Sequence, residues 1–179
     1  MFVRLASLFL AIFIVPAIVF AHGPTRQKMT ETVEIKAPPE KVWAVIGNFQ
    51  DMSWHPAVER TEGAGGNAIE ATRVLFLKGG ADARIDEVLY KYNTDKMSYS
   101  YRITAVDVKV LPVTNYSSHL TVKPAGDGSL VEWRGAFYRG YPNNDPPPEL
   151  NEEAAIKAVT GVYRAGLDNL KAMLEAPSN

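Results

Sequence analysis

Apolar and polar residues alternate through most of the middle of this chain, which predicts a sheet with one buried face. The cleanest run is 97–103, where Met97, Tyr99, Tyr101 and Ile103 alternate with two serines and an arginine. Turns rich in glycine, asparagine or proline separate the runs, so neighbouring strands should pair antiparallel. With 97–103, the predicted strands number about seven; the others are 29–35, 57–61, 71–77, 84–92, 116–123 and 131–137.

A short helix is predicted directly after the first strand. Apolar residues recur at helical spacing over 41–49, and Pro38 and Pro39 precede them, which suits a helix start. Gly47 should separate this helix from a second short helical turn ending near Trp54. Because Pro56 disfavours helical backbone at the preceding residue, the chain should turn outward at His55.

One long helix should follow the proline-rich loop at 140–148. Its apolar residues step by three or four and form a single stripe, made of Ile156, Val159, Tyr163, Leu167, Leu170 and Leu174. A strand, two short helices, several antiparallel strands and a long final helix make an α+β fold. We expect the sheet to curl around the final helix.

The start of the chain has the pattern of a secretory signal peptide. Arg4 precedes an apolar run from Leu8 to Phe20, and Ala21 is a small residue at the expected cleavage position. The alternative is a retained membrane anchor, but the run is shorter than the ~20 residues that a spanning helix needs, and Pro16 interrupts it. The sequence thus predicts a signal peptide over 1–21, a single domain over 22–179 and a periplasmic location.

Composition narrows the possible functions. Among the 179 residues there is no cysteine, so disulfides, thiol catalysis, iron–sulfur ligation and c-type haem attachment are excluded. The net charge is −1 and no block of like charge stands out along the chain. Nucleic acid and, after signal cleavage, membranes are therefore not predicted as partners.

Several segments together resemble the SRPBCC superfamily, whose polyketide cyclase-like and START-related members share the helix-grip (Bet v 1-like) fold. The resemblance spans 30–174 and rests on TVEIKAPPEKVWAVIGNFQDMSWHP, YSYRI, LPVTNY, VEWRGAF and GVYRAGLDNLK. Within the superfamily, the chain most resembles the MxaD-type periplasmic accessory proteins of bacterial methanol oxidation. That resemblance implies a non-enzymatic role beside methanol dehydrogenase and its cytochrome c. A carrier of a small apolar molecule and a cyclase-like enzyme are the alternatives.

In a helix-grip fold, the inward residues of the sheet and the final helix would line a pocket. Buried tyrosine hydroxyls need partners, so inward tyrosines indicate ordered water or the polar end of a ligand. The candidates for the lining of this ligand cavity are Trp54, His55, Arg73, Tyr99, Tyr101, Tyr116, Trp133, Phe137, Tyr163 and Leu167.

Candidate chemistry centres on His55. Its ordinary pKa suits a general base, and Asp51, four residues earlier, is a possible orienting partner. The alternative is that Asp51 stabilises the loop and His55 packs beside Trp54. Since no nucleophile or set of oxyanion donors is evident, no catalytic residue is assigned.

The other charged and metal-ligating candidates have ordinary interpretations. The pattern does not decide whether Arg73 lies on the inner or the outer face of its strand. If it points inward, Glu87 is the acid that should pair with it. His119 falls on the polar phase of its strand and should face solvent. His22 would become the amino-terminal residue, but no second histidine lies near it in sequence, so no metal or cofactor is predicted.

Overall fold

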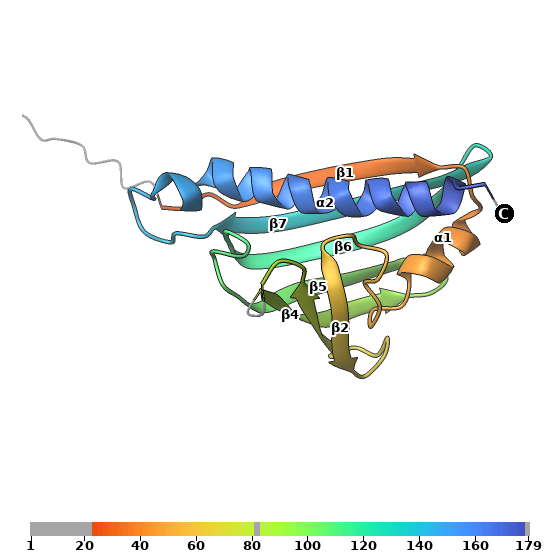
Figure 1. The fold of residues 1–179 in the computed structure, drawn as a ribbon, viewed down its shortest axis with the longest axis horizontal. Coiled ribbons are helices and arrows are strands. Elements are labelled where there is room, and N and C mark those ends of the chain that lie inside the picture. Colours follow the sequence, from red (N-terminus) through yellow and green to blue (C-terminus); the bar gives the residue numbers. More distant parts are fainter. Residues whose placement is uncertain (1–22, 81–82, 178–179) are drawn as a thin grey trace, which may run out of the picture.

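The computed structural model describes residues 23–80 and 83–177; the predicted signal peptide and His22 lie outside this range. The described residues form one antiparallel sheet in the order β1-β7-β6-β5-β4-β3-β2, one short helix and one long helix (Figure 1). The strands are β1 (Gln27–Ile35), β2 (Val58–Ala64), β3 (Thr72–Leu77), β4 (Arg84–Asn93), β5 (Ser98–Val106), β6 (Val113–Ala125) and β7 (Gly128–Arg139). The helices are α1 (Pro39–Ile46), the single 3₁₀ turn η1 (Pro148–Leu150) and α2 (Glu152–Glu175).

The hairpin of β6 and β7 contains the two longest strands of the sheet, and its register shows which residues point inward. Its turn contains Gly126 with a φ of 54°, in the left-handed region that glycine adopts readily. The register places Leu120 opposite Trp133 and Val122 opposite Val131. Directly opposed residues point to the same face of a sheet, so these four side chains share the inner face.

Helix α2 lies lengthwise along β1 and β7 (Figure 1). Its first turn is capped by the Asn151 side chain, whose Oδ1 accepts a hydrogen bond from the Ala154 backbone N–H at 2.8 Å. The buried stripe follows a row of residues four apart, made of Ala155, Val159, Tyr163 and Leu167. Ile156 lies beside this row and is 39% exposed, so the predicted start of the stripe is wrong by one position.

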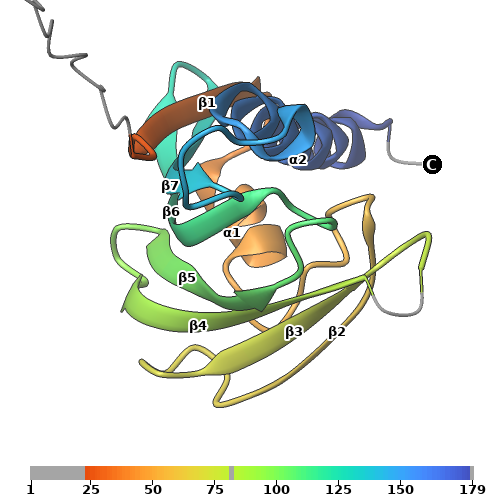
Figure 2. The ribbon, with the colours of Figure 1, turned by 90° about the vertical axis from the view of Figure 1, so that its left-hand side faces the viewer.

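Helix α1 lies within the curve of the sheet, where it contacts β6 and β7 (Figure 2). The predicted second helix after it is wrong, because 47–57 forms turns instead. Asn48 Oδ1 accepts from the Gln50 backbone N–H at 3.1 Å, and Asp51 Oδ1 accepts from that of Ser53 at 2.8 Å. Such local side-chain bonds compete with helical hydrogen bonds and favour turns.

The architecture confirms the predicted α+β helix-grip fold, with a curved antiparallel sheet and a long final helix. Within residues 23–80 and 83–177, no helix has both the length and the apolar character needed to cross a membrane.

Candidate functional site

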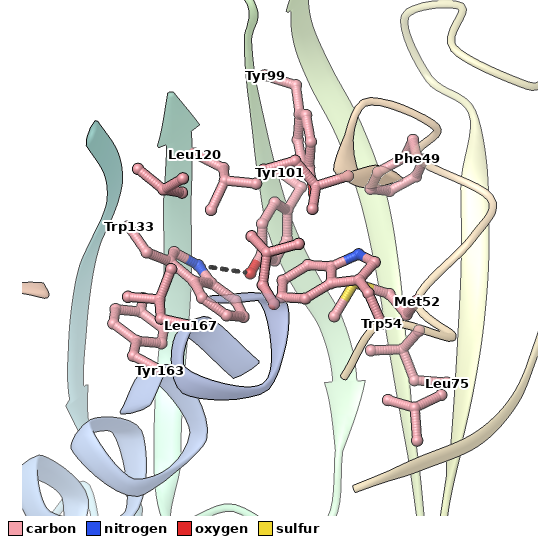
Figure 3. Close-up of a cluster of buried hydrophobic side chains, with 14 of the residues drawn as sticks. Phe49, Met52, Trp54, Leu75, Tyr99, Tyr101, Leu120, Trp133, Tyr163 and Leu167 are labelled. Atoms are coloured by element: carbon pink, nitrogen blue, oxygen red, sulfur yellow. Dashed lines mark hydrogen bonds between the residues drawn. The ribbon is translucent and has the colours of Figure 1, made fainter. Parts of the chain in front are cut away.

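The ten candidate residues come together in one buried group between the sheet, the 47–57 segment and α2. Figure 3 shows Trp54, Tyr99, Tyr101, Trp133, Tyr163 and Leu167 of this group. We call this group the interior cluster; it contains Trp54, His55, Arg73, Tyr99, Tyr101, Tyr116, Trp133, Phe137, Tyr163 and Leu167. None of these residues is more than 5% exposed. The structure therefore brings all of them together, although they come from five strands or loops and one helix.

Aromatic rings fill the middle of this cluster. Trp133 stacks on Tyr163 of α2 with a centroid separation of 4.4 Å, and Trp54 lies 5.6 Å from Trp133 on the other side (Figure 3). Two glycines permit this close approach. A Cβ at Gly166 would lie 2.6 Å from His55 Cδ2, and a Cβ at Gly135 would overlap the Tyr163 hydroxyl. The helix is thus seated directly on the rings.

Three of the buried tyrosine hydroxyls, those of Tyr101, Tyr116 and Tyr163, have hydrogen-bond partners within the protein. The hydroxyl oxygens of Tyr116 and Tyr163 lie 2.6 Å apart, and Ser118 Oγ lies 3.1 Å from that of Tyr163. The indole N–H of Trp133 donates to Ser118 Oγ at 2.9 Å and to the Tyr101 hydroxyl at 3.1 Å. Burial raises the pKa values of Tyr101, Tyr116 and Tyr163, so these hydroxyls stay protonated.

Ser118 is a site residue that sequence reasoning missed. Its hydroxyl also donates to the Arg134 backbone carbonyl at 2.7 Å, so it links two strands and the tyrosine hydroxyls. The signal was present, because Ser118 shares the inward phase of Tyr116 and Leu120. A serine on the apolar phase of a strand indicates a buried polar partner nearby.

His55 is buried, and both of its ring nitrogens are bonded to backbone. Nδ1 accepts from the Ala57 backbone N–H at 3.2 Å, so the ring hydrogen lies on Nε2, which donates to the Val162 carbonyl at 2.9 Å. Burial lowers the pKa of His55 and keeps the ring neutral. Asp51 bonds Ser53 rather than orienting His55, so the packing alternative holds.

Arg73 points inward and pairs with Glu87, the partner expected for an inward Arg73. Their Nε and Oε2 atoms lie 2.6 Å apart, and Nη1 donates to the Phe49 carbonyl at 2.8 Å. The guanidinium carbon also lies 4.2 Å from the centre of the Phe49 ring. Burial alone would lower the pKa of Arg73, but Glu87 raises it overall, so the guanidinium stays charged. Burial raises the pKa of Glu87, and Arg73 opposes that rise.

Two buried donors of the cluster have no hydrogen-bond partner among the described residues. These are the indole nitrogen of Trp54 and Nη2 of Arg73. Figure 3 shows the Trp54 nitrogen on the side of its ring that faces away from Trp133. Both groups can donate to an acceptor oxygen.

Surface hollows of the described chain include three that meet at His119, on the outer face of the sheet. His119 is only partly exposed, because its Nδ1 lies 2.8 Å from Ser100 Oγ and its Nε2 lies 2.7 Å from Thr121 Oγ1. The predicted outward orientation is confirmed. In the part of the chain that the structure describes, no group of three or more His, Asp or Glu side chains is placed to hold a metal ion.

The sequence and the fold of this chain are both similar to those of known proteins. Residues 26–175 match the sequence profile of the family described as polyketide cyclase / dehydrase and lipid transport. The solved structure of the protein XoxI from Bacillus cereus is 32% identical, with a TM-score of 0.69 over 83% of this chain and 96% of that one. An uncharacterised protein from Bacillus thuringiensis is 32% identical, with a TM-score of 0.69 over 83% of this chain and 98% of that one.

A more distant structure extends the likeness of fold. Norcoclaurine synthase from Thalictrum flavum is 16% identical, with a TM-score of 0.64 over 96% of this chain and 99% of its own, which shows the fold alone. No curated protein sequence matches this chain. By the match over 26–175 and the helix-grip architecture, the chain belongs to the polyketide cyclase / dehydrase and lipid transport family of the SRPBCC superfamily.

Proposed function

We propose that this chain is a non-enzymatic periplasmic accessory protein of methanol oxidation, which assists the interaction of methanol dehydrogenase with its cytochrome c. The family membership and the segments that resemble such accessory proteins support the proposal. The observation that carries its non-enzymatic part is that His55 and the hydroxyls of Tyr101, Tyr116 and Tyr163 are bonded to other protein groups. An accessory protein acts through its surface and needs no reactive group in its interior.

The chemistry of these interior groups is the reason for preferring an accessory role. A general base must offer a lone pair within reach of a substrate proton. The lone pair of His55 accepts from Ala57, and its hydrogen is given to Val162. Tyr116 and Tyr163 have raised pKa values and bond each other, so neither supplies an anionic oxygen near neutral pH.

Reduction of the cytochrome in vitro tests the proposal. Purified methanol dehydrogenase and its cytochrome c are mixed with methanol, with and without the mature protein, and cytochrome reduction is followed by absorbance. The protein should speed reduction, and His55→Gln should speed it equally, because no step uses that ring. An equal rate with and without the protein would refute the role. Fractionation of cells should find a chain that begins at His22 in the periplasm.

A carrier of a small molecule is the second candidate. It is favoured by the two unpartnered donors, Trp54 Nε1 and Arg73 Nη2, which lie among aromatic rings. A molecule with an apolar body and acceptor oxygens would match them. Native mass spectrometry of gently extracted protein should then find a bound mass that Trp54→Phe weakens. Protein that is free of ligand in every preparation would exclude a carrier.

A further inference from the structure

The outer face of the sheet, on the side away from α2, carries a row of paired polar residues. Arg134 of β7 lies opposite His119 of β6, His119 opposite Ser100 of β5, and Ser100 opposite Lys91 of β4. Residues paired in this way point to the same face, so the row crosses four strands with a cation at each end. Nothing in the order of these residues along the chain places them side by side.

Neighbouring rows add three more cations. Lys28 pairs across from Ala136, Arg102 pairs across from Ser117, and Lys123 pairs across from Leu130. All of these cations are exposed. We call this surface the basic face; it contains Lys28, Lys91, Arg102, Lys123 and Arg134.

Two carboxylates lie within this surface, Glu132 of β7 and Glu34 of β1, which pairs across from Leu130 in the row of Lys123. Oε1 of Glu132 lies 3.1 Å from Nε of Arg134 and 3.6 Å from Nζ of Lys123. Five cations against two carboxylates leave the basic face positive, whereas the whole chain has a net charge of −1. The positive charge is therefore segregated onto this face by the fold.

His119, at the centre of the basic face, responds to this charge. Burial lowers its pKa, and the positive charges of Arg134, Lys123 and Lys91 lower it further, while Glu132 partly opposes them. Three hollows meet at the same residue and are lined by cations of the basic face, and one of them is also lined by Glu40 and Asp95. The surface is thus positive and indented rather than flat.

We propose that the basic face docks an acidic surface of a partner protein. The inference rests on the proposed function, because an accessory protein needs a contact surface, and it names which surface makes the contact. Ser117 lies between Lys28 and Arg102 in its row, and the carboxylate of Glu132 adds an acceptor among the cations. A folded protein surface offers carboxylates for the cations and donors for Glu132 at fixed positions, whereas a phosphate backbone offers acceptors only.

The dimensions indicate a weak and transient contact. From β1 to β4 the face spans the four spacings between five neighbouring strands, which at ~4.8 Å per spacing is roughly 19 Å. Along the strands, Lys28 and Lys123 differ by six positions of β7, which at ~3.4 Å per residue is roughly 20 Å. The product is about 400 Å², half of the ~800 Å² that each partner buries in a standard interface. Affinity should therefore depend strongly on salt.

Charge reversal tests the basic face. The mature protein, its Lys28→Glu/Lys91→Glu variant and a Lys78→Glu/Lys157→Glu control are titrated against purified methanol dehydrogenase and its cytochrome c. The control makes the same charge change at two exposed lysines outside the basic face. Wild type should bind one of the two proteins and weaken about tenfold between about 20 and about 200 mM salt. Lys28→Glu/Lys91→Glu should bind at least about tenfold more weakly, and the control should stay within about twofold.

Other outcomes separate this inference from the proposed function. If wild type speeds cytochrome reduction but both double variants bind like wild type, the basic face is refuted and the accessory role stands. If binding depends on Lys28 and Lys91 without any effect on reduction, the docking surface stands and the accessory role falls. Wild type that binds neither protein, or that binds only duplex DNA or anionic vesicles, overturns the docking surface.

Discussion

Replacing Glu87 with Gln should destabilise the fold by about 3–5 kcal/mol, because the guanidinium of Arg73 would remain charged in the interior without its counter-ion. The two side chains are 0% and 4% exposed and lie 2.6 Å apart, so water does not screen either charge. For a domain of this size, that loss lowers the melting temperature by roughly 10 °C. Arg73→Met should cost a similar amount, because it leaves the buried carboxylate of Glu87 without a counter-ion.

Removing both charges should be less harmful than removing one. In Arg73→Met/Glu87→Leu no buried charge remains, and the unpartnered Nη2 of Arg73 disappears as well. The methionine keeps much of the contact with Phe49 and Tyr101. We therefore expect the double variant to be more stable than either single variant.

Equilibrium urea unfolding, followed by tryptophan fluorescence, measures these differences. Trp54 and Trp133 lie in the interior cluster, so their emission reports on the core. The matched control is Glu62→Gln, because Glu62 pairs with Arg60 at the surface, where the side chains are 62% and 51% exposed. That change should cost less than about 1 kcal/mol. If Glu87→Gln costs no more than the control, Glu87 is protonated and the pair is not ionic; if the two single losses simply add in the double variant, the charges are not coupled.

Two further predictions concern the seat of the helix and the neutral histidine. Gly166→Ala should destabilise the fold by about 1–2 kcal/mol, because the added Cβ would meet His55 and the indole rings. Gly161→Ala, the control in the same helix, has open space around its Cβ and should be neutral or stabilising by up to about 1 kcal/mol. Equal unfolding free energies for the two variants would contradict the close packing of α2 on the rings. The pKa of His55 is lowered in the folded state, so its contribution to stability is complete above the unfolded value of about 6.5 and is lost as the pH falls through the folded value. Unfolding free energies of wild type and His55→Gln should therefore converge between about pH 7 and about pH 5, and parallel curves would count against a neutral, buried ring.

Local sequence patterns predicted the architecture because each element carries its own period. The alternation over 97–103 and the apolar stripe of α2 are set by geometry within one strand or helix, so both could be predicted without the fold, except that the stripe starts at Ala155 and not at Ile156. The second short helix was mispredicted because Asn48 and Asp51 bond the backbone two residues on and stop the helix. The phase of Arg73 was open, because its strand carries apolar residues on both faces.

The inward residues of the candidate site could be listed from the sequence, but their chemistry could not. Neutral His55 depends on the Val162 carbonyl of α2, and the Tyr163 hydroxyl depends on Tyr116 and Ser118 of β6. These partners are 107, 47 and 45 residues away along the chain. Such pairings are set by how the helix seats on the sheet, which no local pattern encodes.

The distribution of charge shows the difference between what a sequence pattern can predict and what depends on the fold. A net charge of −1, the absence of cysteine and the period of each strand follow directly from the order of the residues. Only the tertiary structure placed Arg134, His119, Ser100 and Lys91 in one row and so produced the basic face. The reason is that strand register, and not order along the chain, decides which side chains share a surface, and register is a property of the assembled sheet.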